Sequence, residues 1–111
     1  MDLQENLPLT ESTFFILLSL APGAKHGYAI IKEVEAISAG RVVLAAGTLY
    51  TALRRMLEDG WIERLEDNQS NGDNRGRKLY SLTDLGRRIF ELETKRLQGL
   101  VRLTARLNGR E

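Results

Sequence analysis

The chain has 111 residues, of which 42% are hydrophobic and 28% charged, and this length allows one domain while excluding a two-domain enzyme with an interdomain cleft. It contains no cysteine, so disulfides and thiolate metal sites are excluded. The net charge is only +1, so any binding of nucleic acid must depend on local clusters of charge rather than on an overall field.

The N-terminal segment contains Asp2 and Glu5 where a secretion signal would carry Lys or Arg. The longest apolar run, Phe14–Leu18, has five residues, whereas a membrane-spanning helix needs about 20. We therefore expect a cytoplasmic protein that does not enter the membrane.

The segment Leu9–Leu20 has the pattern of a first helix, with Thr10 or Ser12 as its N-cap and a Pro-Gly pair soon after its end. Apolar side chains cover most of its circumference. One domain of this size could hardly bury them all, so we expect Phe14 and Phe15 to contact a second subunit.

Two shorter helices follow. The first opens at His26-Gly27-Tyr28 and ends near Ser38-Ala39-Gly40, and its apolar residues recur at helical spacing. After a short connector, Gly47-Thr48 starts another helix, which runs to Asp59 and stops at Gly60. Two helices joined in this way are typical of a helix-turn-helix unit.

A β-hairpin is predicted next. Trp61–Asp67 and Arg77–Leu82 alternate like strands, and the nine residues between them, Asn68–Gly76, have almost pure turn chemistry. Trp61 follows the Gly60 turn, and we expect it to anchor the hairpin to the core, with stacking on a flat ligand as the alternative.

The last predicted helix is capped by Thr83-Asp84 and runs from Leu85 to about Leu107, which makes it roughly 35 Å long. It has two apolar sides, of which one can dock on its own domain and the other on a partner. The docking side comprises Leu85, Ile89, Leu92 and Leu103. The side available for dimerisation comprises Phe90, Leu97, Leu100, Val101 and Leu107.

This order of elements predicts a mainly α fold with a small β-hairpin, of the α+β class. Three helices followed by a hairpin form a winged helix-turn-helix domain, here over residues 1–82. Residues 83–111 then add a C-terminal dimerisation helix. We expect the two parts to form one structural unit.

The second helix of a helix-turn-helix pair enters the DNA major groove with its N-terminal residues first. In the predicted helix from Gly47 to Asp59, hydroxyl-bearing residues occupy the first turn, and arginines follow one turn later on the same side. These candidate contacts are Thr48, Tyr50, Thr51, Arg54 and Arg55. Their hydroxyl and guanidinium groups can bind base edges or phosphates, while the apolar face stays in the core.

The hairpin supplies a second cluster, because Arg75, Arg77 and Lys78 put three positive charges within four residues. In a wing, such side chains would lie beside the DNA backbone. Charge clusters and amphipathic helices also occur on proteins that bind nothing, so it is their combination that favours DNA binding.

Six short motifs follow one another along the chain. They are Thr13–Leu20 (TFFILLSL), His26–Ile30 (HGYAI), Gly47–Tyr50 (GTLY), Ala52–Met56 (ALRRM), Glu58–Ile62 (EDGWI) and Tyr80–Gly86 (YSLTDLG). In this order and at these spacings they resemble the PadR-like transcriptional regulators, a family of winged helix-turn-helix repressors. The resemblance covers about Leu9–Leu92, and the chain looks like the short subfamily with a single C-terminal helix.

The resemblance implies a homodimer that binds double-stranded DNA at a palindromic operator and represses transcription, in many members until a small effector releases the DNA. It also implies a phosphate contact by Tyr28 and a wing near the minor groove. The operator contacts that it implies are Thr48, Tyr50, Thr51 and Arg54. Ala46 departs from the family's frequent proline, and Thr51 departs from its commonly basic residue.

No residue pattern for catalysis is present. His26 is the only histidine, which excludes multi-histidine metal sites, and we expect it to cap and pack the second helix. Neither a nucleophile elbow nor a glycine-rich phosphate loop occurs. We therefore expect no enzyme activity, no metal and no cofactor.

Two other functions compete with DNA binding. A winged-helix module for protein–protein interaction would use the apolar first and last helices and never meet DNA, and the near-neutral net charge favours it. Binding of the last helix to a membrane surface is disfavoured, because its arginines do not gather on one face opposite a single apolar face.

Overall fold

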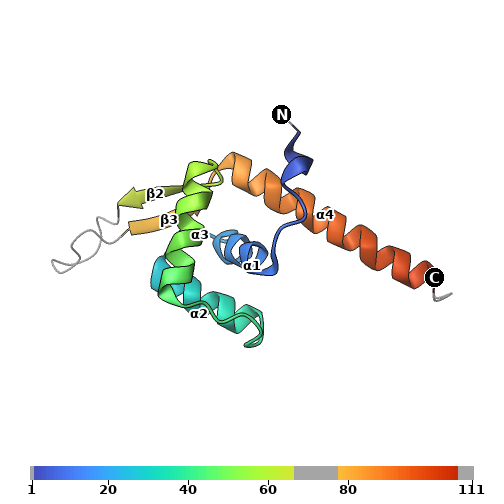
Figure 1. The fold of residues 1–111 in the computed structure, drawn as a ribbon, viewed down its shortest axis with the longest axis horizontal. Coiled ribbons are helices and arrows are strands. Elements are labelled where there is room, and N and C mark those ends of the chain that lie inside the picture. The colour runs from blue at the N-terminus through green and yellow to red at the C-terminus, as the bar shows by residue number, and fades with distance from the viewer. Residues whose placement is uncertain (1, 67–77, 108–111) are drawn as a thin grey trace.

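The computed structural model describes residues 2–66 and 78–107 and shows a mainly helical fold with a small antiparallel sheet (Figure 1). Its helices are α1 (Glu11–Leu20), α2 (Gly27–Ile37), α3 (Ala46–Glu58) and α4 (Asp84–Leu107), preceded by a short 3-10 helix, η1 (Leu3–Asn6). Its strands are β1 (Lys25–His26), β2 (Ile62–Glu66) and β3 (Lys78–Leu82). The predicted fold class is confirmed, and the predicted helices and hairpin lie close to their expected bounds.

The sheet has three strands in the order β1-β3-β2, whereas the sequence predicted only the hairpin of β2 and β3. Lys25 pairs with Tyr80, and His26 pairs with Leu79. Two residues are too few to show the alternation that predicts a strand, so β1 has no signal in the sequence. The strand joins the start of α2 to the base of the hairpin.

Helix α1 packs against α2 and α4 and lies near the centre of the fold (Figure 1). Of its two candidate N-caps, Thr10 takes the position, since its hydroxyl accepts a hydrogen bond from the Thr13 amide at 3.1 Å. Ile16 and Leu17 are completely buried, so the single chain covers more of α1 than the sequence led us to expect.

The end of α3, the base of the hairpin and the start of α4 meet at Trp61. This side chain is only 9% exposed and packs in the core, where it anchors the hairpin. Thr83 accepts a hydrogen bond from the Gly86 amide at 3.0 Å, and its own amide donates to the Trp61 carbonyl at 3.0 Å. Gly86 lies so close to that carbonyl that a Cβ would collide with it. The first turn of α4 is thereby fixed on the hairpin.

A buried carboxylate, which the sequence pattern does not reveal, joins the N-terminal segment to α4. Glu93 is 2% exposed, and its Oε2 accepts a hydrogen bond from the Leu9 amide at 3.0 Å. Arg96 donates to both carboxylate oxygens, at 2.6 and 3.0 Å. The hydrogen bonds from Arg96 lower the pKa of Glu93, because they favour the charged form more than burial disfavours it.

The second half of α4 projects away from the rest of the molecule (Figure 1). Apolar side chains are exposed along it, among them Val101 at 66% and Leu107 at 86%. In the part of the chain that the structure describes, no helix combines the length and hydrophobicity needed to cross a lipid bilayer.

Candidate nucleic-acid interface

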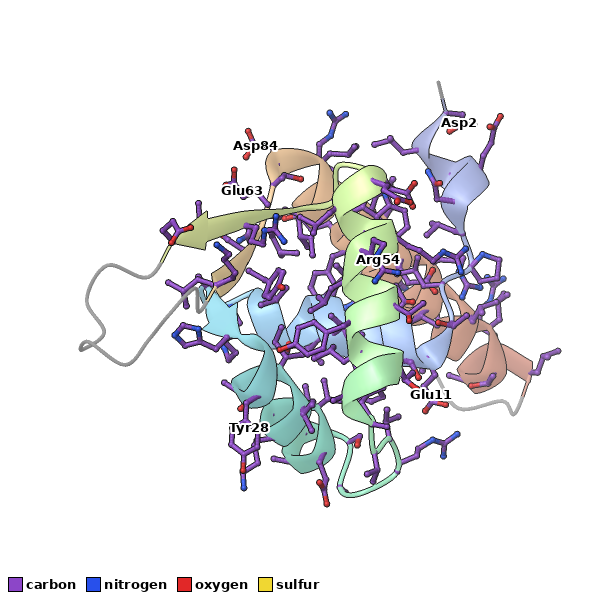
Figure 2. The ribbon with its side chains drawn as sticks, turned by 60° about the vertical axis from the view of Figure 1, so that its left-hand side comes forward. Asp2, Glu11, Tyr28, Arg54, Glu63 and Asp84 are labelled. Atoms are coloured by element: carbon purple, nitrogen blue, oxygen red, sulfur yellow. The ribbon has the colours of Figure 1, made fainter. Side chains whose placement is uncertain are left out.

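Helix α3 presents one polar face on the outside of the molecule. Figure 2 shows the helix lengthwise at the front, with Arg54 at mid-length and with Tyr28 of α2 and Glu63 of β2 to one side of it. Leu49 and Leu53, four residues apart, are buried on the opposite face. This amphipathic pattern fixes which side of α3 faces outward.

The exposed face begins in the first turn of α3. Thr48 and Thr51 are exposed there, and the exposed Arg54 follows one turn later. The N-cap residue, Ala45, offers no side-chain acceptor, so the first amides of the helix are available to an anion such as a phosphate. The space in front of Gly47 is open, which allows close approach of another molecule.

Tyr50 lies at the edge of this face and packs against α2. The end of its ring fills the space that a side chain at Gly27 would need, with Tyr50 Cζ 2.8 Å from the position of a Cβ there. Tyr50 is nevertheless 44% exposed. The ring therefore braces the start of α2 against α3, and only part of it is left to contact another molecule.

Tyr28 stands at the start of α2 and is 69% exposed. Lys32 Nζ lies 5.4 Å from the centroid of the Tyr28 ring, within the range of a cation–π contact. Tyr28 and Lys32 thus put an exposed hydroxyl and a positive charge on the first turns of α2. Tyr28 directly follows Gly27, the residue against which the Tyr50 ring packs.

Arg54 and Arg55 do not share one side of α3, contrary to the expectation from the sequence. Successive residues of a helix are rotated by about 100° around its axis. Arg54 lies on the exposed face (Figure 2), whereas Arg55 lines a pocket between α3 and the N-terminal segment. Arg54 is therefore the arginine better placed to enter a DNA groove.

Only the base of the predicted wing lies within the described residues, and Arg75 and Arg77 fall outside them. Lys78 stands opposite Glu66 on the hairpin ladder and pairs with it, with Nζ 2.7 Å from Oε2. An ion pair at an exposed position contributes at most about 1 kcal/mol. Lys78 can therefore exchange Glu66 for a phosphate at little cost.

His26 occupies the N-cap position of α2, but its side chain does not cap the helix, so that expectation is wrong. Its Nδ1 instead lies 2.9 Å from the carbonyl oxygen of Lys78, to which Nδ1–H donates. This contact holds β1 against the N-terminal end of β3. Among the described residues, no cluster of three or more histidine and acidic side chains could hold a metal ion.

A second candidate surface lies where α1 meets α4. Phe14 of α1 stacks on Phe90 of α4, with ring centroids 5.4 Å apart and planes inclined by 26°. Phe15 meets Phe14 edge-on at 5.9 Å. Phe14 therefore contacts both other aromatic dimerisation candidates within the chain, and all three are only partly exposed.

The aliphatic dimerisation candidates lie farther along α4. Leu97 and Val101 line an open groove of about 600 Å³, whose other wall includes Phe14. Leu100 and Leu107 are exposed beyond it. The groove and the end of α4 together form an apolar surface that starts at the aromatic stack.

Comparison with known proteins identifies relatives of this fold. The sequence model of the transcriptional regulator PadR-like family matches residues 16–92. A crystal structure of a PadR family transcription regulator from Clostridium difficile R20291 shares 28% identity and a TM-score of 0.70, over 86% of this chain and 96% of that one. Bacillus subtilis PadR, solved in complex with operator DNA, shares 23% identity and a TM-score of 0.61, over 70% of this chain and 43% of that one.

A curated relative is much longer than this chain. It is a 37.1 kDa protein of transposon TN4556 from Streptomyces fradiae, with 34% identity over 101 residues. The match covers 90% of this chain but 25% of the relative, so the chain spans about a quarter of that protein's length.

Proposed function

The chain belongs to the transcriptional regulator PadR-like family, and from this membership we propose that it is a homodimeric, cytoplasmic repressor that binds a palindromic operator. Members of the family are transcriptional regulators, not enzymes. The observation that carries the proposal is the outer face of α3, on which Thr48, Thr51 and Arg54 are exposed. A small effector that releases the DNA is part of the proposal.

The outer face of α3 has the size and chemistry of a major-groove reader. A helix with its side chains is about 10–12 Å wide, and the groove is about 12 Å wide. The Arg54 guanidinium can donate two hydrogen bonds to guanine O6 and N7, and the hydroxyls of Thr48 and Thr51 can bind bases or phosphates. Arg54 is therefore the proposed base contact, with the two threonines beside it.

Other side chains flank α3 and are proposed to position it. Tyr28 on α2 and Lys78 at the N-terminal end of β3 would bind phosphates beside the groove, because both carry polar groups that can donate to phosphate oxygens. Additional contacts are proposed for Tyr50, Arg55, Arg75 and Arg77.

Dimerisation is proposed for the apolar surface between α1 and α4. In this proposal residues 1–82 form the DNA-binding part and residues 83–111 the dimerisation helix. The groove lined by Leu97 and Val101, with the exposed Leu107 beyond it, would be covered by the same surface of a second copy. Two copies related by a two-fold axis would place their α3 helices in successive major grooves, about 34 Å apart.

A mobility-shift assay tests the proposal, with a duplex from upstream of the chain's own gene and a scrambled duplex of the same composition. Such repressors often control their own genes, so we expect preferential binding of the upstream duplex. In the Arg54→Gln variant the preference should be lost while weak binding to both duplexes persists. Equal binding of both duplexes by the unaltered protein would argue against a specific site on this DNA.

A module for protein–protein interaction is the second candidate, because the net charge is near neutral and the end of α4 is apolar and exposed. In that case α4 would bind another protein and α3 would contact no DNA. The mobility-shift assay separates the two, since the interaction module would shift neither duplex at any salt concentration.

A further inference from the structure

A pocket of about 300 Å³ opens between α3 and the N-terminal segment that precedes α1. It lies apart from the groove between α1 and α4. Its walls combine apolar groups, including Pro8, Met56 and Trp61, with two charged side chains, Arg55 of α3 and Asp59, which caps the C-terminus of that helix. A volume of this size is at the lower limit of small-molecule sites, which hold a few polar groups in apolar surroundings.

The two charged side chains stand one helical turn apart. Residues at i and i+4 lie on the same side of a helix, with their Cβ atoms about 5–6 Å apart. Within the part of the chain that the structure describes, neither the Arg55 guanidinium nor the Asp59 carboxylate has a hydrogen bond or an ion pair. The pocket therefore offers a positive and a negative group, close together and both available to a ligand.

The remaining walls are already ordered. Trp61 and Met56 are nearly buried and hold the inner side of the pocket. The Thr10 hydroxyl donates to the Thr13 hydroxyl at 2.9 Å. The N-terminal segment is held by the hydrogen bond from the Leu9 amide to Glu93. Binding would therefore require little rearrangement of these walls, which favours affinity.

We propose that this pocket binds a small zwitterion with an apolar body, of the class of the α-amino acids with aliphatic side chains. The carboxylate would pair with Arg55 and the ammonium group with Asp59, while the side chain would pack on Trp61. Both protein groups are exposed to solvent, so a zwitterion is preferred because it forms two ion pairs with the pocket where a ligand with a single charge forms one.

Binding of the ligand would also regulate the binding of DNA. This consequence rests on the proposed function, whereas binding of the ligand to the pocket does not. Arg55 belongs to the helix proposed to read DNA. A ligand that pairs with its guanidinium withdraws this charge from the DNA backbone. Occupation of the pocket would therefore weaken the binding of DNA.

Trp61 makes the binding directly measurable, because it is the only tryptophan of the chain. Its fluorescence would be followed during titration of the DNA-free protein with L-valine, L-leucine and L-methionine. We expect a saturable change with at least one of them. Arg55→Gln and Asp59→Asn should each weaken binding about three- to fivefold, as expected for an exposed ion pair, while the matched control Arg54→Gln changes it less than twofold.

Charge-deleted probes test the zwitterion assignment. We expect 4-methylpentanoate, which lacks the ammonium group, and isopentylamine, which lacks the carboxylate, to bind about three- to fivefold more weakly than L-leucine. Absence of a saturable change with all three amino acids would overturn the site, as would binding that Arg55→Gln leaves intact. Equal binding of 4-methylpentanoate and L-leucine would overturn the zwitterion class.

A second measurement separates this inference from the proposed function. In the presence of the bound amino acid, the affinity for the upstream duplex should fall at least threefold, and Arg55→Gln should abolish that response. An unchanged affinity would overturn the regulatory coupling. A saturable fluorescence change in a protein that binds no DNA would support the site while contradicting the proposed function.

Discussion

Arg54 is the side chain whose replacement should affect sequence recognition most. In Arg54→Ala, loss of a bidentate contact to a guanine should cost about 1–3 kcal/mol on the operator. The loss on random DNA should be smaller, since phosphates carry no sequence information. Fluorescence anisotropy with both duplexes measures the difference, and an equal loss on both would make Arg54 a phosphate contact.

Replacement by alanine should destabilise the fold more at Gly86 than at Gly27, because the atoms next to Gly86 belong to the backbone and cannot move aside as a side chain can. A Cβ at Gly86 would collide with the Trp61 carbonyl, which belongs to the backbone, whereas a Cβ at Gly27 meets only the end of the Tyr50 side chain. We expect Gly86→Ala to lower the free energy of unfolding by about 3 kcal/mol and Gly27→Ala by about 1 kcal/mol.

Urea denaturation compares these two variants with Gly23→Ala, at a position with open space around it. Gly23→Ala should change the free energy of unfolding by less than about 0.5 kcal/mol. If Gly86→Ala proved as mild as Gly23→Ala, the close approach of α4 to the base of the hairpin would be incorrect.

Glu93 makes stability depend on pH in the acid range. The pKa of Glu93 is lowered in the folded chain from its ordinary value of about 4.5. Its contribution to the free energy of unfolding is therefore complete above that value and is lost as pH falls through the folded pKa. At pH 7, Glu93→Gln should reduce the free energy of unfolding by about 1–3 kcal/mol, because it removes the charge that Arg96 and the Leu9 amide bind.

The difference between the unaltered chain and Glu93→Gln should shrink below about pH 4. Urea denaturation at a series of pH values measures it. Glu91→Gln, an exposed position on the same helix, serves as the control and should behave as the unaltered chain. A difference that stays constant down to pH 2 would show that the charge of Glu93 plays no part.

At the scale of elements, α4 should determine whether the chain is a dimer. Val101→Asp would put an uncompensated charge into the proposed interface and should raise the dimer dissociation constant at least tenfold, about 1.4 kcal/mol. Arg106→Asp, about 140° around the helix axis from Val101 and outside the residues that line the groove, is the control. Sedimentation equilibrium measures both, and an unchanged dissociation constant for Val101→Asp would remove this face from the interface.

The elements themselves differ in how well the sequence predicted them. The four long helices have apolar residues at helical spacing, such as Leu49 and Leu53, and end at glycines or turns, so the local pattern suffices. Strand β1 depends on pairing with residues more than fifty positions away, and a local pattern holds no trace of it. The capping expectation for His26 failed for the same reason, since its partner is the distant Lys78 carbonyl.

The sequence predicted which residues of the candidate DNA interface are exposed, but it did not predict the contacts that these residues make with other elements. Burial of Leu49 and Leu53 determines the outward face of α3, so the exposure of Thr51 and Arg54 follows from periodicity. The contact of Tyr50 with Gly27 and the position of Arg55 in a pocket depend on α2 and on the N-terminal segment. Tertiary neighbours of this kind are absent from the pattern of a single helix.

In the whole molecule, recognition of a palindromic operator depends on two outer faces of α3 that are presented together to one duplex. Selection of bound sites from a randomised pool of DNA duplexes, followed by sequencing, tests this most directly. We expect enrichment of two inverted half-sites with centres about 10–10.5 base pairs apart, and loss of this enrichment in Arg54→Ala. Absence of enrichment, or a single asymmetric site of one half-site length, would contradict it.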